Sequence, residues 1–372
     1  MNDFFWIIEL RQLWVLLAGI FFLLPIAQTP DYSRGQLLLK PSNGAIYLWL
    51  TAAALSIALT PEATMGGDKI NYTNSFLRIA SGMNVWNEVD KDVLFSAWMY
   101  FVSRFTENPT VFFLLTTTVY VGGLAFALKR IGKTYWAVMM IAAVFGLGFF
   151  AYGDNTLRAG MAYSLLLVGV SFFTDRKAVG VAFACLSIFI HHSMLIPVSA
   201  LTVALFYRNT KIIFLGWIFL LVVSILFGNA TQEFLAGLFE NAEDRRLASY
   251  ALGQSDGVYD QGFRWDFLIY GFVPIALGLY YRYRKRFEDP FYLWILNTYI
   301  IANGFWLLMI RAIFTDRFAY LSWGLMPIVL FYPLIRRRIW ANQSLFVAGG
   351  LFLVLALNLA LASRTLIQSL YQ

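Results

Sequence analysis

Residues 178–207 read AVGVAFACLSIFIHHSMLIPVSALTVALFY and decide the fold, because two apolar runs enclose His191 and His192, the only histidines of the chain. A membrane helix takes about 17–25 mostly apolar residues, and fewer where its ends are anchored in protein. Ionisable side chains at membrane depth are rare and usually functional. The stretch therefore predicts two membrane helices with a functional histidine pair at their junction.

The composition of the whole chain agrees with this interpretation. Of its 372 residues, 60% are hydrophobic and 13% are charged, whereas soluble domains have roughly 45–50% apolar and 25% charged residues. We therefore expect an all-α polytopic membrane protein that forms a single membrane domain over residues 1–372. The net charge of +7 lies in short connectors, which excludes a nucleic-acid partner.

The apolar segments predict about twelve membrane helices, with a range of roughly 11–13. The expected spans lie near residues 5–27, 44–60, 107–128, 134–151, 156–174, 178–191, 193–207, 212–228, 265–281, 290–310, 317–335 and 343–362.

Lysine and arginine in alternate connectors predict the orientation of these spans, since cytoplasmic connectors are rich in both residues. Two long extracytoplasmic loops follow from this topology, 61–106 and 229–264. The first contains an apolar segment near 93–102, which we interpret as a re-entrant or interfacial helix. The second has apolar residues at helical spacing and is expected to lie on the membrane surface as one or two amphipathic helices.

This topology gathers unusual polar residues on or just below the outer face. Arginine there runs against the usual charge bias and indicates an anion, because its planar guanidinium binds phosphate oxygens bidentately. The pattern predicts a substrate with a lipid-linked phosphate or pyrophosphate. The residues concerned are Asp68, Asp92, Arg158, His191, His192, Arg264, Asp266, Arg311, Asp316 and Arg317.

Each of these residues also has a structural interpretation. Arg158 follows Asp154 by four positions, so the two residues can form an ion pair at a helix end. Arg317 is next to Asp316 and can pair with it locally. His192 can be a satisfied histidine at a helix terminus. Arg264 and Asp266 flank a tryptophan at the start of a span, where interface anchors are common.

Motifs of other enzyme classes are missing from the sequence. It has no H-E-x-x-H, G-x-S-x-G, Walker A or paired C-x-x-C pattern, which disfavours zinc proteases, serine hydrolases, ATPases and dithiol redox enzymes. Asp90-Lys91-Asp92 has the D-x-D form of some metal-binding glycosyltransferases. Three residues carry little information, and nucleotide sugars do not occur on the outer face.

Several short motifs resemble the EpsG family, a branch of the Wzy-type polysaccharide polymerases. They occur in the family's order between about residues 44 and 330. The family often has an arginine before the first motif, where this chain has Thr60-Pro61-Glu62, and a proline after the acidic residue of the second, where this chain has Val93. The matching segments are Gly67-Asp68-Lys69-Ile70-Asn71-Tyr72, Asp92-Val93-Leu94-Phe95, Asn155-Thr156-Leu157-Arg158, Ile190-His191-His192-Ser193 and Asp316-Arg317-Phe318-Ala319-Tyr320.

The resemblance implies a GT-C-like membrane glycosyltransferase of the bacterial inner membrane. It implies transfer of an oligosaccharide repeat from undecaprenyl pyrophosphate to the non-reducing end of another lipid-linked repeat at the outer face. We expect inversion at the anomeric carbon and no cofactor or metal, since arginines can supply the positive charge. The expected partners are these lipid-linked oligosaccharides, membrane lipids and a chain-length regulator.

Roles for the candidate residues follow from this interpretation. His191 and Asp68 are the candidates for the catalytic base. Asp68 has the alternative role of positioning the acceptor sugar. The residues expected to bind pyrophosphate are Arg158, Arg311, Arg317 and Arg264, and those expected to bind the acceptor sugar are Tyr72, Asp92, Asp316 and Tyr320.

Three other functions stay open at this point. An O-antigen ligase would differ in its acceptor only. A transporter or flippase of lipid-linked sugars should carry charged residues through the depth of several spans, whereas here they gather at the span ends. A membrane acyltransferase could also use the histidine, but it would not need arginines that bind pyrophosphate.

Overall fold

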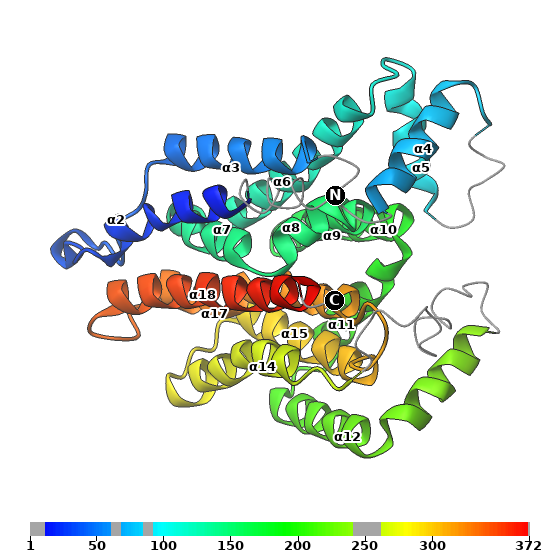
Figure 1. The fold of residues 1–372 in the computed structure, drawn as a ribbon. Helices are drawn as coiled ribbons and strands as arrows, with labels where there is room; N and C mark the ends of the chain where they lie inside the picture. The colour runs from blue at the N-terminus through cyan, green and yellow to red at the C-terminus, as the bar shows by residue number, and fades with distance from the viewer. Residues whose placement is uncertain (1–11, 61–67, 85–91, 241–261, 371–372) are drawn as a thin grey trace. The chain divides into compact units, whose positions relative to one another are not determined.

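The structure is a computed structural model that describes residues 12–60, 68–84, 92–240 and 262–370. For residues 229, 231–240 and 362–370 it describes the backbone alone. All regular elements in these ranges are helices (Figure 1). The chain divides into two compact units, which are unit 1 (Met1–Leu195 and Phe331–Gln372) and unit 2 (Ile196–Leu330). The expected single membrane domain stays a prediction.

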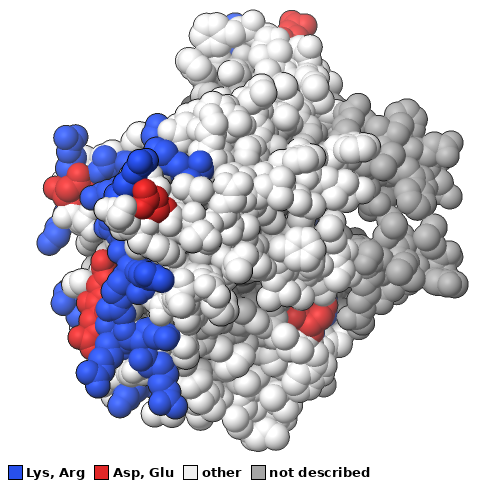
Figure 2. Space-filling model, turned by 90° about the vertical axis from the view of Figure 1, so that its left-hand side faces the viewer, with Lys and Arg blue, Asp and Glu red and all other residues white. Residues whose placement is uncertain are grey.

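Apolar helices account for most of the described chain, as a membrane protein requires. Five helical segments of the described chain are long and apolar enough to cross a membrane. Six further apolar helices have 10–17 residues. The predicted spans coincide with helices wherever the structure describes them, while the number of crossings and the GT-C-like arrangement stay predictions. Much of the visible described surface in Figure 2 carries no charged side chain, which suits contact with lipid.

Unit 1 contains both of the sequence segments that carry His191 and Arg158. Its helices are α2 (Leu23–Ala27), α3 (Asn43–Ala58), α4 (Asp68–Ala80), α5 (Val93–Ser103), α6 (Pro109–Gly132), α7 (Trp136–Phe145), α8 (Gly148–Asp154), α9 (Leu157–Phe172), α10 (Lys177–Ile190) and α18 (Gln343–Leu370), with the short 3₁₀ helices η1 (Tyr32–Arg34), η4 (Lys133–Tyr135) and η5 (His192–Met194).

Helix α9 is the central helix of unit 1 and packs between α6 and α10 (Figure 1). Glycines let α9 and α10 approach closely. A Cβ atom on Gly169 would lie 2.8 Å from the carbonyl oxygen of Gly180, and one on Gly180 would lie 2.9 Å from that of Gly169. Close approach through small residues is typical of packed membrane helices. Because the connector between the two helices is short, the start of α9 and the end of α10 lie at the same end of the pair.

Helices α4 and α5 pack against each other, and α5 packs against α10 (Figure 1). Both helices fall in the first predicted extracytoplasmic loop. Helix α5 agrees with the helix predicted near 93–102, and its placement relative to the membrane stays a prediction. Helix α4 was not expected, because its apolar residues are few. Residues 61–67 and 85–91, which include Asp90 and Lys91, lie outside the described residues.

The span predicted at 134–151 is broken in the structure. Helix α7 ends at Phe145, Gly146 has an extended backbone, and α8 begins at Gly148. The break leaves carbonyl groups at the end of α7 without partners inside the helix. The buried side chain of Asn358 on α18 donates a hydrogen bond from Nδ2 to the Phe145 carbonyl oxygen at 2.8 Å.

Unit 2 is built around the buried helix α15, against which α12, α14 and α16 pack. Helix α12 has non-helical backbone angles at Phe227 and continues beyond this kink, so the second predicted loop begins as a helix. Residues 241–261 of that loop lie outside the described residues. The elements are α11 (Leu195–Phe206), α12 (Thr210–Glu240), α14 (Trp265–Leu279), the π-helix η6 (Tyr280–Arg284), α15 (Pro290–Leu308), α16 (Thr315–Trp323) and α17 (Met326–Arg336), the last of which ends in unit 1.

Candidate functional site

Two helix ends of unit 1 bring Arg158 and His191 together. Arg158 is in the first turn of α9, and His191 directly follows α10. The backbone of His191 is extended (φ −153°, ψ 118°), so the chain leaves the helix at this residue. Since α9 and α10 pack along each other, the two side chains share one end of the helix pair. That the two residues act in one functional site stays a prediction.

Asp92 lies at the centre of this site and binds both side chains. It precedes the first residue of α5, which packs on α10. Its Oδ2 atom lies 2.7 Å from Arg158 Nη1 and 3.1 Å from His191 Nδ1. Its Oδ1 atom accepts a hydrogen bond from the backbone N–H of His192 at 3.1 Å. The carboxylate thus joins three helices of unit 1 at one point.

The surroundings of Asp92 keep its carboxyl group ionised. Burial alone raises the pKa of this group. The hydrogen bond with His191, the charges of His191 and Arg158 and the N–H of His192 act in the opposite direction and prevail. The pKa of Asp92 therefore lies below its ordinary value of 3.8. When His191 is neutral, the ionised carboxylate can accept a hydrogen bond from its Nδ1–H, which leaves the lone pair on Nε2.

The Nε2 atom of His191 faces Ser193. The Ser193 hydroxyl oxygen lies 3.2 Å from this atom, and His191 Nδ1 faces Asp92 on the other side. Serine, histidine and carboxylate in this order form the arrangement in which an imidazole accepts a proton from a hydroxyl. Sequence reasoning did not give Ser193 a role, although the Ile190-His191-His192-Ser193 motif contained it.

Tyr72 binds the other edge of Arg158. Its hydroxyl oxygen lies 3.1 Å from Arg158 Nε, and its ring centroid lies 5.5 Å from the centre of the guanidinium group. Tyr72 is on α4, and Asp68 is the first residue of the same helix. The charge of Asp68 also acts on Arg158. Arg158 thus connects α4 to Asp92.

These contacts argue against the local ion pair of Arg158 with Asp154. The guanidinium group binds Asp92 and Tyr72, whereas the Asp154 carboxylate accepts its hydrogen bond from Gln12 at 2.6 Å. The local ion pair between Arg158 and Asp154 is therefore not formed. The interaction that replaces it joins residues that lie 66 positions apart, which local spacing does not reveal.

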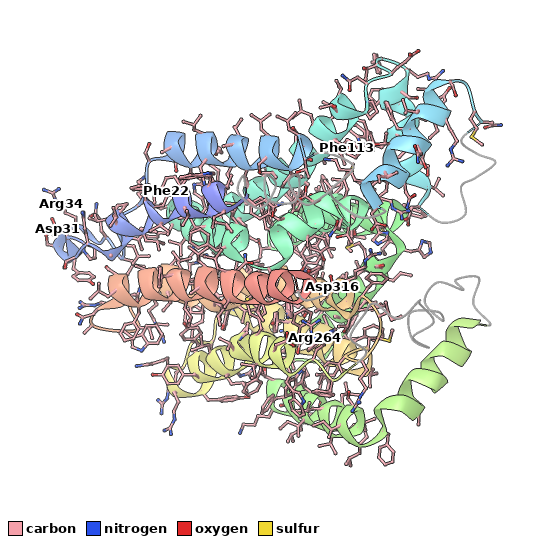
Figure 3. The ribbon with its side chains drawn as sticks, in the orientation of Figure 1. Phe22, Asp31, Arg34, Phe113, Arg264 and Asp316 are labelled. Carbon is pink, nitrogen blue, oxygen red and sulfur yellow. The ribbon has the colours of Figure 1, made fainter. Side chains whose placement is uncertain are left out.

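The remaining predicted residues lie in unit 2. Arg264 forms two hydrogen bonds with Asp266, at 2.9 and 2.7 Å, and lies over the Phe267 ring at 3.5 Å. Arg264 is thus paired locally, while its role as an interface anchor or in pyrophosphate binding stays a prediction. Tyr320 is hydrogen-bonded to Asp316, so these two candidates for sugar binding meet. Arg264 and Asp316 are labelled in Figure 3, near the starts of α14 and α16.

Arg311 and Arg317 have different surroundings. Arg317 lies over the Phe314 ring at 4.5 Å. Arg311 lies over the Phe263 ring at 5.3 Å, and its buried Nε atom has no hydrogen-bond partner among the described residues. A guanidinium N–H that is buried without an acceptor is costly unless a ligand or water binds it.

Metal binding was not expected from the sequence. Within the described ranges, no group of three or more His, Cys, Asp or Glu side chains is placed to hold a metal ion. Metal independence itself stays a prediction, since two of the residues in the Asp90-Lys91-Asp92 motif lie outside those ranges.

Comparison with known proteins supports the family resemblance. The model of the EpsG family matches residues 46–370, which cover the site in unit 1 and the candidate residues of unit 2. No curated protein and no solved structure matches the chain. The match extends over most of the sequence and includes every motif on which the resemblance was based. The chain therefore belongs to the EpsG family of Wzy-type polymerase-like membrane proteins.

Proposed function

We propose that this protein is a polysaccharide polymerase of the bacterial inner membrane. It transfers an oligosaccharide repeat from undecaprenyl pyrophosphate to the non-reducing end of another lipid-linked repeat on the outer face. The observation that carries the proposal is the Asp92–His191–Ser193 arrangement beside Arg158. It provides a base for a hydroxyl group. Membership of the EpsG family supports the assignment of this hydroxyl to a sugar.

In the proposed reaction His191 is the catalytic base. Asp92 holds the Nδ1–H of the imidazole. The acceptor hydroxyl takes the place of the Ser193 hydroxyl at Nε2, which accepts its proton. The acceptor oxygen then forms a bond to the anomeric carbon of the donor. The bond from that carbon to the pyrophosphate oxygen breaks, and undecaprenyl pyrophosphate leaves with the electron pair. A single displacement of this kind inverts the anomeric centre.

The candidate arginines have different roles in this reaction. Arg158 is bound to Asp92 and Tyr72, so its main role is to hold Asp92 and His191 in place. Binding of pyrophosphate is its second role. In unit 2, the Nε atom of Arg311 has no hydrogen-bond partner within the described part of the chain, and Arg311 is the better candidate for the leaving pyrophosphate, together with Arg317. Cations that are already in place stabilise the charge developing on this group. No cofactor is needed for these steps.

Asp68 and Tyr72 are assigned to the acceptor sugar in this proposal. Both lie on α4, and Asp68 acts on Arg158 electrostatically. Asp68 is the alternative base. Loss of polymer synthesis in Asp68→Ala but not in His191→Ala would reverse the two assignments.

Purified protein in liposomes, supplied with a synthetic undecaprenyl pyrophosphate repeat, tests the function. We expect a ladder of longer glycans. Unchanged substrate that crosses the vesicle membrane would instead support a flippase. Transfer of the repeat to a different lipid acceptor, with no ladder, would support a ligase.

The adjacent histidines provide a matched pair of variants for the base. We expect His191→Ala to lower the rate of polymer synthesis by about 10²–10⁴-fold, the usual contribution of a general base. His192→Ala should stay close to the wild-type rate, because His192 binds Asp92 through its backbone N–H. Near wild-type rates in both His191→Ala and Asp68→Ala would show that the base is neither residue.

A further inference from the structure

A second pair of charged side chains in unit 1 has no part in the proposed chemistry. Lys69 on α4 is 3% exposed, and Asp154 at the end of α8 is 4% exposed. Lysine and aspartate are almost never buried to this degree unless they are paired. Both residues lie close in sequence to residues of the site, since Lys69 precedes Tyr72 by three positions and Asp154 precedes Arg158 by four.

The ammonium group of Lys69 is saturated with backbone acceptors. It donates hydrogen bonds to the carbonyl oxygens of Ile57, Ala58 and Thr60 at 3.1, 3.3 and 2.6 Å. These carbonyls lie at the C-terminal end of α3, where a positive charge is favourable. The Nζ atom also lies 4.6 Å from the ring centroid of Phe113 on α6, which is labelled in Figure 3. Lys69 thus binds the end of α3 through hydrogen bonds and contacts α6, which stabilises the position of α4.

The carboxylate of Asp154 depends on Lys69 for its charge balance. Gln12 donates a hydrogen bond to Oδ2 at 2.6 Å. Burial raises the pKa of Asp154 to about 7, while the positive charge of Lys69 and the hydrogen bonds of Thr60 and Gln12 favour its ionised form. Oδ1 accepts no hydrogen bond within the described part of the chain. Removal of the Lys69 charge therefore favours the neutral form of Asp154, and removal of the Asp154 charge leaves the buried ammonium group with carbonyl acceptors but no counter-charge.

This pair lies next to the contact that supports the base assembly. Lys69 and Tyr72 share a face of α4, because side chains three positions apart in a helix are neighbours. The α8–α9 junction follows Asp154 directly and leads to Arg158. The hydrogen bond of 3.1 Å between Tyr72 and Arg158 therefore joins helix α4, which contains Lys69, to the start of α9, which follows Asp154.

We propose that Lys69 and Asp154 are positioning residues, which set the distance between Tyr72 and Arg158 and so hold Asp92 against His191. Neither residue touches a reacting atom. The effect on polymer synthesis rests on the proposed function, whereas the effect on Tyr72 is independent of it.

Three variants distinguish a positioning role of the two residues from a role in folding. Asp154→Asn and Lys69→Met each remove one charge, and Lys69→Met/Asp154→Leu removes both charges and leaves no charge unbalanced. Lys177→Met is the matched control, because Lys177 is exposed at the start of α10. Fluorotyrosine introduced at Tyr72 gives a fluorine NMR signal that reports its hydrogen bond to Arg158. Arg158→Ala marks the signal of the unbound tyrosine.

We expect the fluorine signal of all three variants to move toward that of Arg158→Ala. Polymer synthesis per folded molecule should fall by about 10- to 100-fold, since a misplacement of about 1 Å at a site has an effect of this size. Lys177→Met should change neither readout. If folded Lys69→Met/Asp154→Leu keeps the wild-type signal, the positioning role is wrong.

The remaining outcomes are also decisive. If none of the three variants accumulates as folded protein, the pair serves folding and the positioning proposal is overturned. If the wild-type protein makes no polymer while the fluorine signal shifts as expected, the proposed function fails and the positioning role stands.

Discussion

Asp92 is the residue on which the candidate site depends, because it binds Arg158, His191 and the backbone of His192 with two oxygen atoms. Arg158 and the two adjacent histidines come from different parts of the chain. A neutral side chain at this position would still accept the N–H of His192, but it would not balance the charge of Arg158. The site therefore requires the ionised form of Asp92.

The pH dependence of stability follows from the lowered pKa of Asp92. An aspartate whose pKa is lower in the folded than in the unfolded protein stabilises the fold above its unfolded pKa, about 3.9. This contribution is lost as the pH falls through the folded pKa. We expect Asp92→Asn to lower the thermal midpoint by a constant amount at neutral and mildly acidic pH. The difference from wild type should shrink below about pH 4.

Thermal unfolding in detergent over this pH range measures the effect. A difference that persists unchanged at the lowest pH would mean that the charge of Asp92 is not the cause. Asp175, an exposed carboxylate whose pKa is lowered by its hydrogen bond to Arg130, provides the control. Asp175→Asn should change the midpoint little, because exposed ion pairs contribute little.

Variants of Tyr72 and Arg158 test separately the two hydrogen bonds of the guanidinium group, one to Tyr72 and one to Asp92. Tyr72→Phe removes one hydrogen bond and should lower the stability by about 0.5–1.5 kcal/mol. Arg158→Lys should have a larger effect on stability and on polymer synthesis, because an ammonium group cannot bind Tyr72 and Asp92 with a planar fork. Thermal midpoints and glycan yields of the two variants, measured together, check this order. Equal effects would contradict a bridging role.

At the scale of helices, the start of α9 is held against α8 by Gly160. A Cβ atom at this position would lie 2.6 Å from the backbone carbonyl oxygen of Tyr152, which cannot move aside alone. We expect Gly160→Ala to destabilise the protein by about 1–3 kcal/mol. Polymer synthesis should also fall, because Arg158 is two residues away.

Gly122 on α6 is the matched control for this exchange. A Cβ atom there meets nothing within 4 Å, and alanine is favoured over glycine inside a helix by roughly 0.5–1 kcal/mol. Gly122→Ala should therefore be neutral or stabilising in thermal unfolding. A loss of stability equal to that of Gly160→Ala would show that the contact with α8 is not responsible.

Helices α3, α6, α9 and α10 were predictable because their apolar length alone indicates them. Helix α4 was not, since only tertiary contacts place Phe76 and Lys69 in the interior. The sequence placed Arg158 and His191 on one membrane face through the charge bias of the connectors. It could not place Asp92 between them, because that contact depends on how α5 packs on α10. His191 and Asp92 lie 99 positions apart, and no periodicity spans that distance.

At the scale of the molecule, the proposed orientation can be tested with cysteines introduced into unit 1. Exchange of the exposed Cys185 for alanine removes the native thiol. Met83→Cys, after α4, should then react with a membrane-impermeant maleimide in intact spheroplasts. Lys177→Cys, in a predicted cytoplasmic connector, should react only after the membrane is permeabilised. The reverse pattern would place the candidate site on the cytoplasmic side.

The hydrogen bond from Asn358 to the Phe145 carbonyl has a consequence for the order of biosynthesis. The two residues are 213 positions apart, so α7 leaves the ribosome long before α18 has been made. A carbonyl in the hydrocarbon region costs several kcal/mol while it lacks a partner. We therefore expect the break between α7 and α8 to lack this hydrogen bond until α18 has been made. The segment that leads to Arg158 should then reach its final hydrogen bonding later than α7 itself.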